Sequence, residues 1–285
     1  MPISLLDPKN DYVFKRLFAD APALLADLIS AVRHDCPPVR EVQVLNPRIE
    51  PADLHGKYIV LDLLARDAAG RHYNVEMQVR RYHDYSERAA YYLANTLAGQ
   101  LERGEDYAEL PGAVGIHLLD FSLYAPLQWH WCFELRDRAH PQVRLTETLQ
   151  LHLLELPKAR DEGPVGTALA AWVAYFAHWQ EDEIMANIQH APVHDAMNRL
   201  QALSVDEEAK RRAFERERAL HDEISLLNGA RKEGRIEQLS RQLRRKFGPL
   251  PESAVRRLQQ AGEPELDRWG DAVLFADTLD AVFGD

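Results

Sequence analysis

The sequence predicts an α/β fold followed by a smaller helical unit, on three observations. The chain has 285 residues, of which 46% are hydrophobic, so it can bury the core of one large α/β domain and still form a helical unit. Segments with strand-like patterns are separated by segments in which apolar residues recur at helical spacing. From about Val205 the composition becomes dense in charges of both signs along a helical pattern.

The first elements are expected to be helical. Apolar residues recur at near-helical spacing over Asp11–Val32, and Pro22 is expected to break this helix. A loop is expected at Pro37 and Pro38, and Val39–Val44 is predicted to be a short connecting segment.

Two strands joined by a tight turn are predicted next. Tyr58–Arg66 is an apolar run rich in branched residues, which is typical of a buried strand. Tyr73–Val79 alternates between apolar residues and the polar Asn74, Glu76 and Gln78, which is the pattern of a half-buried strand.

The alternation of helices and strands continues to about residue 200. Helices are predicted over Ser86–Leu101 and Pro164–Gln180, and a strand is predicted over Ala113–Leu119. Two further strands are expected where apolar residues alternate: Trp129, Trp131, Phe133 and Leu135 in one, and Leu149, Leu151 and Leu153 in the other.

A domain boundary is expected near residue 200, so that residues 1–200 form the α/β domain and residues 201–285 a C-terminal helical domain. In the second part, Ile236, Leu239, Leu243 and Phe247 predict a helix that stops at Gly248-Pro249. A short helical tail is expected to carry Leu258, Leu266, Trp269 and Leu274. The mixed-charge helix before it suits either a protein–protein surface or a plain cap on the first domain.

Charge and composition narrow the class of protein. The formal net charge of -11 argues against tight non-specific binding to nucleic acid, although a local excess of acid is compatible with a divalent-cation site. Cys36 and Cys132 alone give neither a metal-ligand spacing nor a disulfide framework. The N-terminal segment lacks the pattern of a signal peptide, and no apolar run approaches the roughly 20 residues of a membrane span. A cytoplasmic protein without membrane contact is expected.

The register of the predicted hairpin decides whether a candidate site forms. With Ala68-Ala69-Gly70 as a three-residue loop, Gly70 takes the left-handed position that such loops favour. In that register Asp62 lies directly opposite Glu76, and Gln78 follows on the same face. A loop one residue shorter or longer would instead put the two carboxylates on opposite faces.

Two opposed carboxylates need a partner. They repel each other, and burial adds a desolvation cost, so a shared proton, a cationic side chain or a metal ion is required. Mg²⁺ suits Asp62 and Glu76, with the backbone carbonyl of Met77 as a further ligand. Such an ion would activate water for attack on a phosphodiester, and Gln78 would hydrogen-bond the water or the phosphate. Alternatively, Glu76 and Gln78 form the solvated face of an edge strand, although Asp62 still interrupts an otherwise apolar run.

Basic and aromatic residues follow the second strand. Arg80, Arg81 and Arg88 could line a path for phosphates, and Tyr82, Tyr85 and Tyr92 interleave aromatic rings with them. Tyrosines at helical spacing also suit a plain core. Arg88 and Tyr92 are four residues apart and therefore share one face of the predicted helix.

Several short segments follow one another in an order that can be compared with known protein families. They are DYVFKRLF at 11–18, the strand with Asp62, NVEMQ at 74–78, SERAAYY at 86–92 and GEDY at 104–107. In this order the chain resembles the Rpn family of recombination-promoting nucleases, also described as putative transposases, within the PD-(D/E)xK superfamily. RKFGPLP at 245–251 and LDRW at 266–269 resemble the helical domain often appended to these proteins.

The resemblance implies a restriction-endonuclease-like fold, with a mixed central sheet flanked by helices. It also implies DNA cleavage that depends on Mg²⁺ (or Mn²⁺) and serves recombination or mobile elements. The family's aspartate corresponds to Asp62 and its E-x-Q to Glu76 and Gln78. Gln78 stands where the wider superfamily has a lysine, so Lys15 is the candidate for the missing positive charge. Asp11 is a further candidate metal ligand.

A rival function comes from a different class of protein. The acidic net charge and the missing lysine favour a non-catalytic DNA- or protein-binding module that keeps the nuclease fold. Strand transfer is a second enzymatic variant, suggested by the transposase description alone. A homodimer through the C-terminal helical region would suit an enzyme that cuts both strands of DNA.

Overall fold

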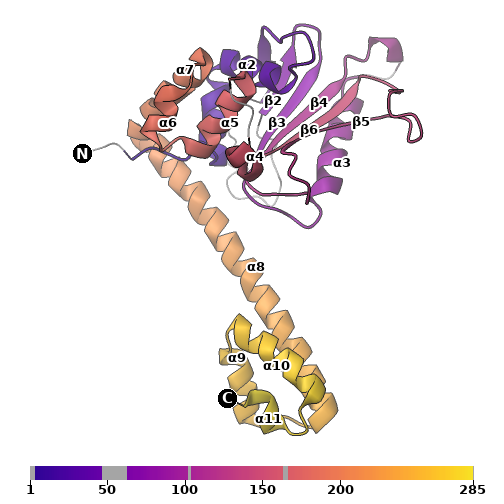
Figure 1. Cartoon of the computed structure of the whole chain (residues 1–285), viewed down its shortest axis with the longest axis vertical. Helices are drawn as coiled ribbons and strands as arrows, with labels where there is room; N and C mark the ends of the chain where they lie inside the picture. The colour runs from indigo at the N-terminus through magenta and orange to yellow at the C-terminus, as the bar shows by residue number, and fades with distance from the viewer. Residues whose placement is uncertain (1–3, 47–62, 102–103, 163–165, 285) are drawn as a thin grey trace. The chain divides into compact units, whose positions relative to one another are not determined.

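The computed structural model describes residues 4–46, 63–101, 104–162 and 166–284 (Figure 1). The chain divides into two compact units, Met1–Arg216 and Glu217–Asp285. The long helix α8 (Glu207–Phe247) contributes to both units. Each unit has a hydrophobic core of its own.

The first unit is built on a mixed six-stranded sheet in the order β1-β2-β3-β4-β6-β5. The central pairs β3–β4 and β4–β6 are parallel, and the outer pairs are antiparallel. The strands are β1 (Val42–Val44), β2 (Leu63–Asp67), β3 (His72–Gln78), β4 (Ala113–Leu119), β5 (His130–Glu134) and β6 (Leu149–Glu155). A mixed sheet flanked by helices confirms the predicted α/β, restriction-endonuclease-like class.

The hairpin between β2 and β3 has the predicted register. Leu63 pairs with Val75 and Leu64 with Asn74, as a three-residue loop requires. Gly70 has a φ of 83°, a left-handed conformation in which glycine avoids the steric clash of a Cβ atom. Asp62, the predicted partner of Glu76, lies outside the described residues.

One face of the sheet is covered by α1 (Asp11–Ala19), α2 (Pro22–Val32) and α5 (Ala168–His178). Proline begins α2, as it tolerates the first turn of a helix but not its interior. The sheet presents apolar side chains to these helices, among them Val75 and Ile116, and Phe14, Phe18, Trp172 and Phe176 form an aromatic cluster there. We call this side the α1 face.

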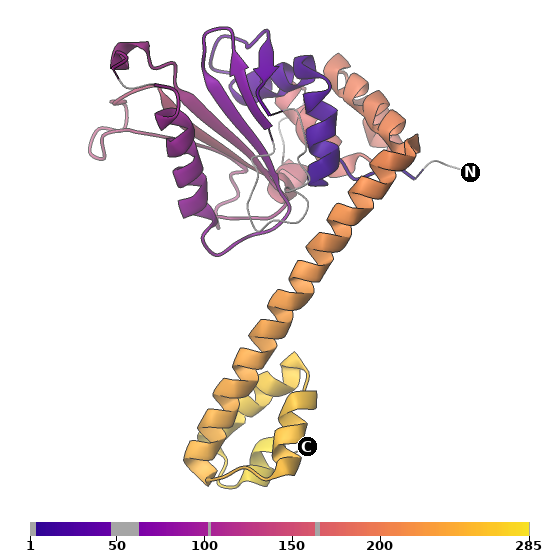
Figure 2. The ribbon, with the colours of Figure 1, turned by 180° about the vertical axis from the view of Figure 1, so that it is seen from behind.

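The opposite face is covered by α3 (Tyr85–Ala98), which packs against β3, β4 and β6 (Figure 2). Tyr85, Ala89 and Leu93 recur every fourth residue and form its buried stripe. At Gly115 of β4, a Cβ atom would come within 2.7 Å of Leu151 Cδ1 and 3.7 Å of Leu93 Cδ1. Glycine at this position therefore leaves room for the Leu151 side chain of β6, which packs under α3. We call this side the α3 face.

Two expectations about strands are wrong in detail. The segment β3 is buried on both faces rather than half-buried, because α3 covers the side that carries Asn74 and Glu76. The segment predicted as a connection contains β1, because Val42 pairs with Asp67 along the open edge of β2. Such burial depends on tertiary packing, which a period-two pattern does not report.

Four further helices belong to the described part of the first unit. They are η2 (Tyr107–Glu109), α4 (Leu156–Glu162), α6 (Asp182–Asn187) and α7 (Ala191–Val205). None of the helices in the described part of the chain combines the length and apolar character needed to span a bilayer.

The second unit is a small helical core around the end of α8. Helices α9 (Glu252–Gln260), α10 (Glu263–Phe275) and α11 (Leu279–Phe283) pack there on Leu243, and Trp269 meets Phe283 edge to face at 4.8 Å. The predicted stop of α8 is confirmed, since Gly248 follows it with a φ of 85°. Leu274 is 65% exposed and lies outside this core, whereas Val273 is buried.

Candidate active site

A buried carboxylate lies at the centre of the α3 face. The period-two geometry of β3 places Asn74, Glu76 and Gln78 on one side of the strand. Asn74 Nδ2 donates to Glu76 Oε1 at 2.9 Å, and Gln78 Nε2 donates to Glu76 Oε2 at 3.0 Å. Glu76 is 4% exposed. Its orientation is therefore set by amides of its own strand, one on each side.

A histidine and a tyrosine stand next to this carboxylate. His117 of β4 is the register partner of Glu76, and its Nε2 lies 4.0 Å from Glu76 Oε2. The other ring nitrogen, Nδ1, is hydrogen-bonded to the Tyr85 hydroxyl at 2.8 Å. The imidazole is therefore hydrogen-bonded to α3 through Tyr85, and the pairing of β3 with β4 places it next to Glu76.

Burial controls the ionisation of this pair. Desolvation lowers the pKa of His117 below its ordinary value, and the Glu76 carboxylate offsets this effect in part. Burial, and next to it the negative charge of Glu76, raise the pKa of Tyr85. Near neutral pH the site therefore holds a neutral imidazole and a neutral phenol.

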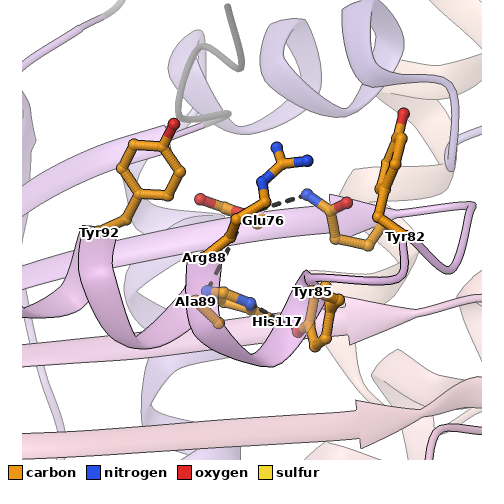
Figure 3. A pocket seen from close by; sticks show the side chains of 8 residues that line it. Glu76, Tyr82, Tyr85, Arg88, Ala89, Tyr92 and His117 are labelled. Atoms are coloured by element: carbon orange, nitrogen blue, oxygen red, sulfur yellow. Dashed lines mark hydrogen bonds and ion pairs between the residues drawn. The ribbon is translucent and has the colours of Figure 1, made fainter.

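A pocket opens between α3 and the sheet, and Figure 3 shows its side chains facing one another. Its lining residues are Glu76, Gln78, Tyr82, Tyr85, Arg88, Ala89, Tyr92 and His117. The Arg88 guanidinium lies 5.0 Å from the centre of the Tyr82 ring, a cation–π contact. A carboxylate, an amide, a cation and aromatic rings therefore converge in one place.

The pocket brings together six of the residues singled out in the sequence, including the rings of Tyr82 and Tyr85. Glu76 and Gln78 come from β3, and Arg88 and Tyr92 come from one face of α3, as their spacing predicts. Arg80 and Arg81 lie in the connection between the two elements and are not among the lining residues in the described part of the chain.

The remaining candidates lie elsewhere in the described residues. Lys15 is buried on α1, whose neighbour Phe14 packs in the core of the α1 face. Asp11 accepts a hydrogen bond from Arg216 Nε at 2.8 Å and forms an ion pair with that guanidinium. Met77 lies between Glu76 and Gln78, and its side chain belongs to the α1 face.

A comparison with protein families identifies the chain's relatives. The sequence model of the PD-(D/E)XK nuclease family transposases matches residues 8–230. The chain belongs to this family. The match spans all six strands of the sheet and extends into α8. No curated protein and no solved structure matches the chain significantly.

Membership confirms the resemblance seen in the sequence and indicates a nuclease-like role for the chain. PD-(D/E)XK nucleases typically use divalent metal ions and act on DNA. The residues of the α3 face fit such an ion on their own chemistry. Among the residues that the structure describes, the buried atoms Asn74 Oδ1 and His117 Nε2 have no hydrogen-bond partner. His117 Nε2 lies 4.0 Å from Glu76 Oε2, and the Asn74 amide contacts the carboxylate through Nδ2. The described residues contain no group of three or more His, Cys, Asp or Glu side chains that could together hold a metal ion.

Sequence reasoning missed Asn74 and His117 as neighbours of Glu76, and it did not foresee that Tyr85 contacts His117. A signal for His117 was present, because it is the sole polar side chain of the run AVGIHLL. Asp62 is singled out in the sequence on the same ground, because it too interrupts an apolar run. Lys9 was also missed. Its Nζ donates to Asp120 Oδ2 at 2.7 Å, and the Asp120 amide donates to the Gln78 carbonyl at 2.9 Å.

Proposed function

We propose that this protein is a divalent-metal-dependent DNA endonuclease that hydrolyses phosphodiester bonds in the service of recombination or mobile elements. One observation carries the proposal. In the described part of the chain, the buried Glu76 carboxylate is held by neutral amides and has no Lys or Arg partner, yet it lines a pocket with Arg88. A buried charge in that state is stabilised when a cation binds beside it.

Asp62 is proposed as the second carboxylate. It lies outside the described residues, and its support is the adjacent pair Leu63–Val75, which has the register that the sequence predicts. A divalent cation held by Asp62 and Glu76, Mg²⁺ or Mn²⁺, would supply Lewis-acid activation of water and neutralise charge at the phosphate. The carbonyl of Met77 and the carboxylate of Asp11 stay predictions as further ligands.

The chain's own groups have separable tasks in this proposal. Gln78 orients Glu76 and offers its amide to the attacking water or to the phosphate. Arg88 binds a phosphate oxygen, and Tyr92 provides an aromatic surface on which a base can stack. We assign to Arg88 the positive charge that a lysine supplies elsewhere in the superfamily, because it lines the pocket. Lys15, Arg80 and Arg81 stay predictions.

Nicking of supercoiled plasmid tests the proposal. The wild-type chain is expected to cut only with Mg²⁺ or Mn²⁺, and Asp62→Ala and Glu76→Gln are each expected to lose cutting without unfolding. Glu109→Gln, which removes an exposed carboxylate on η2, is the matched control and should retain wild-type activity. Equal activity in wild type and Asp62→Ala would remove Asp62 from the mechanism. Absence of divalent-dependent nicking in the wild type would favour a non-catalytic DNA- or protein-binding module.

Two cuts in one duplex are most simply made by two copies of a site. A homodimer through the C-terminal helical region would supply them, and this stays a prediction of the sequence. Light scattering on the full chain, with and without duplex DNA, measures the oligomeric state directly.

A further inference from the structure

His117 lies in the middle of a fully buried strand, next to a buried carboxylate. It interrupts β4, a strand in which every residue is buried, and it is itself 2% exposed. In the parallel pairing of β3 and β4 it is the register partner of Glu76, so the two side chains lie next to each other on the α3 face. Burying two ionisable side chains next to each other costs desolvation energy, so their placement needs a physical explanation.

The two ring nitrogens of His117 have different surroundings. Nδ1 is hydrogen-bonded to the Tyr85 hydroxyl at 2.8 Å. Nε2 is buried, has no hydrogen-bond partner among the described residues, and lies 4.0 Å from Glu76 Oε2. The ring is therefore held at one end, and its other end is directed at the carboxylate without touching it.

The surroundings of Nε2 combine a glycine, leucine side chains and an amide, since the Gly115 position also adjoins Leu151 and Leu93. Gly115 precedes His117 on the same face of β4, and a Cβ atom there would lie 3.6 Å from His117 Nε2. Across from Gly115 stands Asn74, whose Oδ1 is also buried without a hydrogen-bond partner in the described part of the chain. A ring nitrogen and an amide oxygen of two residues that adjoin Glu76 thus lack hydrogen-bond partners among the described residues.

The spacing suits a shared small cation. Ligand atoms lie about 2.0 to 2.2 Å from such ions, so two ligands of one ion are about 3 Å apart when adjacent and about 4.2 Å apart when opposite. The observed 4.0 Å between Glu76 Oε2 and His117 Nε2 is close to the second of these spacings. Mg²⁺ strongly prefers oxygen ligands, whereas an imidazole nitrogen favours first-row transition ions.

We propose that His117 is a ligand, through Nε2, of the metal ion that Glu76 holds, and that the site therefore binds a first-row divalent transition cation more tightly than Mg²⁺. This inference rests on the proposed function, because it adds a nitrogen ligand to the same metal site. Tyr85 is the positioning residue, since it fixes the ring from its other nitrogen.

The tautomer of His117 distinguishes this role from a purely structural one. Ligation through Nε2 requires that Nδ1 carries the proton and donates it to the Tyr85 oxygen, the arrangement usual for metal-binding histidines. In the other tautomer the Tyr85 hydroxyl donates to Nδ1, and Nε2–H faces the carboxylate. That arrangement would orient Glu76 without contributing a ligand.

Electron spin-echo envelope modulation on the full chain loaded with Mn²⁺ separates the two tautomers. We expect nitrogen modulation from a directly bound imidazole in the wild type, and its loss in His117→Gln. The matched control is His152→Gln, because His152 is also a buried histidine but is the register partner of Ile116 and so lies on the α1 face. The control should retain the nitrogen signal.

Two results would overturn the inference: a wild-type spectrum without nitrogen modulation, or the same modulation in His117→Gln. Glu76→Gln separates this failure from a failure of the proposed function. If Mn²⁺ binding requires Glu76 but shows no nitrogen from His117, the inference alone is wrong. If Mn²⁺ binds equally well without the Glu76 carboxylate, the proposed metal site is wrong.

Calorimetry provides an independent readout that does not need catalysis. His117→Gln should weaken Ni²⁺ binding by about tenfold or more and leave Mg²⁺ binding within about twofold, because imidazole suits Ni²⁺ and Mg²⁺ prefers oxygen ligands. Tyr85→Phe keeps the ligand but removes the hydrogen bond that fixes its ring, so Ni²⁺ binding should fall by about tenfold with the nitrogen signal of the Mn²⁺ form retained. Should His117→Gln fail to fold, as judged by circular dichroism, Tyr85→Phe still decides the matter, since unchanged Ni²⁺ affinity in that variant contradicts the proposal.

Discussion

The two faces of the central sheet differ in the kind of side chain that the same strands bury on each. Along β3, Val75 and Met77 face the α1 side, where they join an apolar core, whereas Asn74, Glu76 and Gln78 face α3. Both sets are largely buried. A single residue step along one strand therefore separates the packing that stabilises the fold from the groups proposed for chemistry.

The two faces differ in whether their buried atoms have favourable partners. The α1 face buries hydrocarbon and aromatic rings, such as Phe18 against Trp172 at 5.6 Å, and this burial stabilises the fold. The α3 face buries a carboxylate and leaves Asn74 Oδ1 and His117 Nε2 without hydrogen bonds among the described residues. Unsatisfied buried polar atoms destabilise a fold, so the α3 face lowers stability, as is expected of a face that carries the proposed metal site.

Substitutions at two neighbouring residues of β4 test most sharply whether the two faces have separate roles. Ile116→Ala opens a cavity in the α1 face and should lower the free energy of unfolding by about 2 to 5 kcal/mol, with Mn²⁺ affinity unchanged. His117→Gln, one residue on, should change metal binding far more than stability. Urea denaturation and calorimetry on the two variants measure both quantities. If Ile116→Ala weakened metal binding as much as His117→Gln did, the two faces would not be separable.

A smaller effect is expected at the mouth of the α3 face. Arg88→Gln removes the cation that lines the pocket, so DNA binding should weaken and the slope of log K against log salt should fall by about 0.9. Fluorescence anisotropy at several salt concentrations measures this slope. The exposed Arg138, which lies outside the pocket, provides the control Arg138→Gln. An equal loss of slope in both variants would mean that Arg88 contributes only to the general surface charge.

A substitution that restores the superfamily's cation sharpens the assignment of Gln78. Gln78→Lys is expected to retain or increase cleavage of plasmid DNA, because a lysine can still reach Glu76 Oε2 and adds a positive charge near the phosphate. Complete loss of cleavage with intact metal binding would show that the amide of Gln78 makes a contact that lysine cannot replace.

The smallest expected effect concerns histidines at the edge of the α1 face. His130 Nε2 and His152 Nδ1 are 3.1 Å apart, and burial lowers the pKa of each from 6.5 to about 4. The unfolded chain then binds more protons than the folded chain between these values. Stability is therefore full above about pH 6.5 and falls as the pH drops towards about 4. Thermal melts of wild type and His152→Gln measure the dependence, which should be shallower in the variant; an identical pH profile would contradict this account.

Local rules in the sequence were sufficient for several elements. The strand Ala113–Leu119 has the predicted bounds, because an apolar run between turns has few alternatives. The register of β2 and β3 followed from Gly70, whose left-handed conformation fixes the loop length. The end of α8 followed from Gly248, because a glycine in the left-handed conformation commonly terminates a helix.

The candidate site depended on contacts that local patterns do not encode. The pairing of Glu76 with His117 joins parallel strands that are separated in the chain by α3, so neither residue's neighbours in sequence indicate it. The burial of the polar side of β3 likewise follows from the packing of α3. Arg88 and Tyr92 were within reach of the sequence, because helical spacing alone places them on one face.

The most direct test of the central claim, that the α3 face around Glu76 is a divalent-metal site, is a calorimetric titration of the full chain with Mn²⁺. The account predicts saturable binding by the wild type and by Glu109→Gln, and loss of that binding in Glu76→Gln. Binding of equal affinity in Glu76→Gln, with the fold intact by circular dichroism, would contradict it.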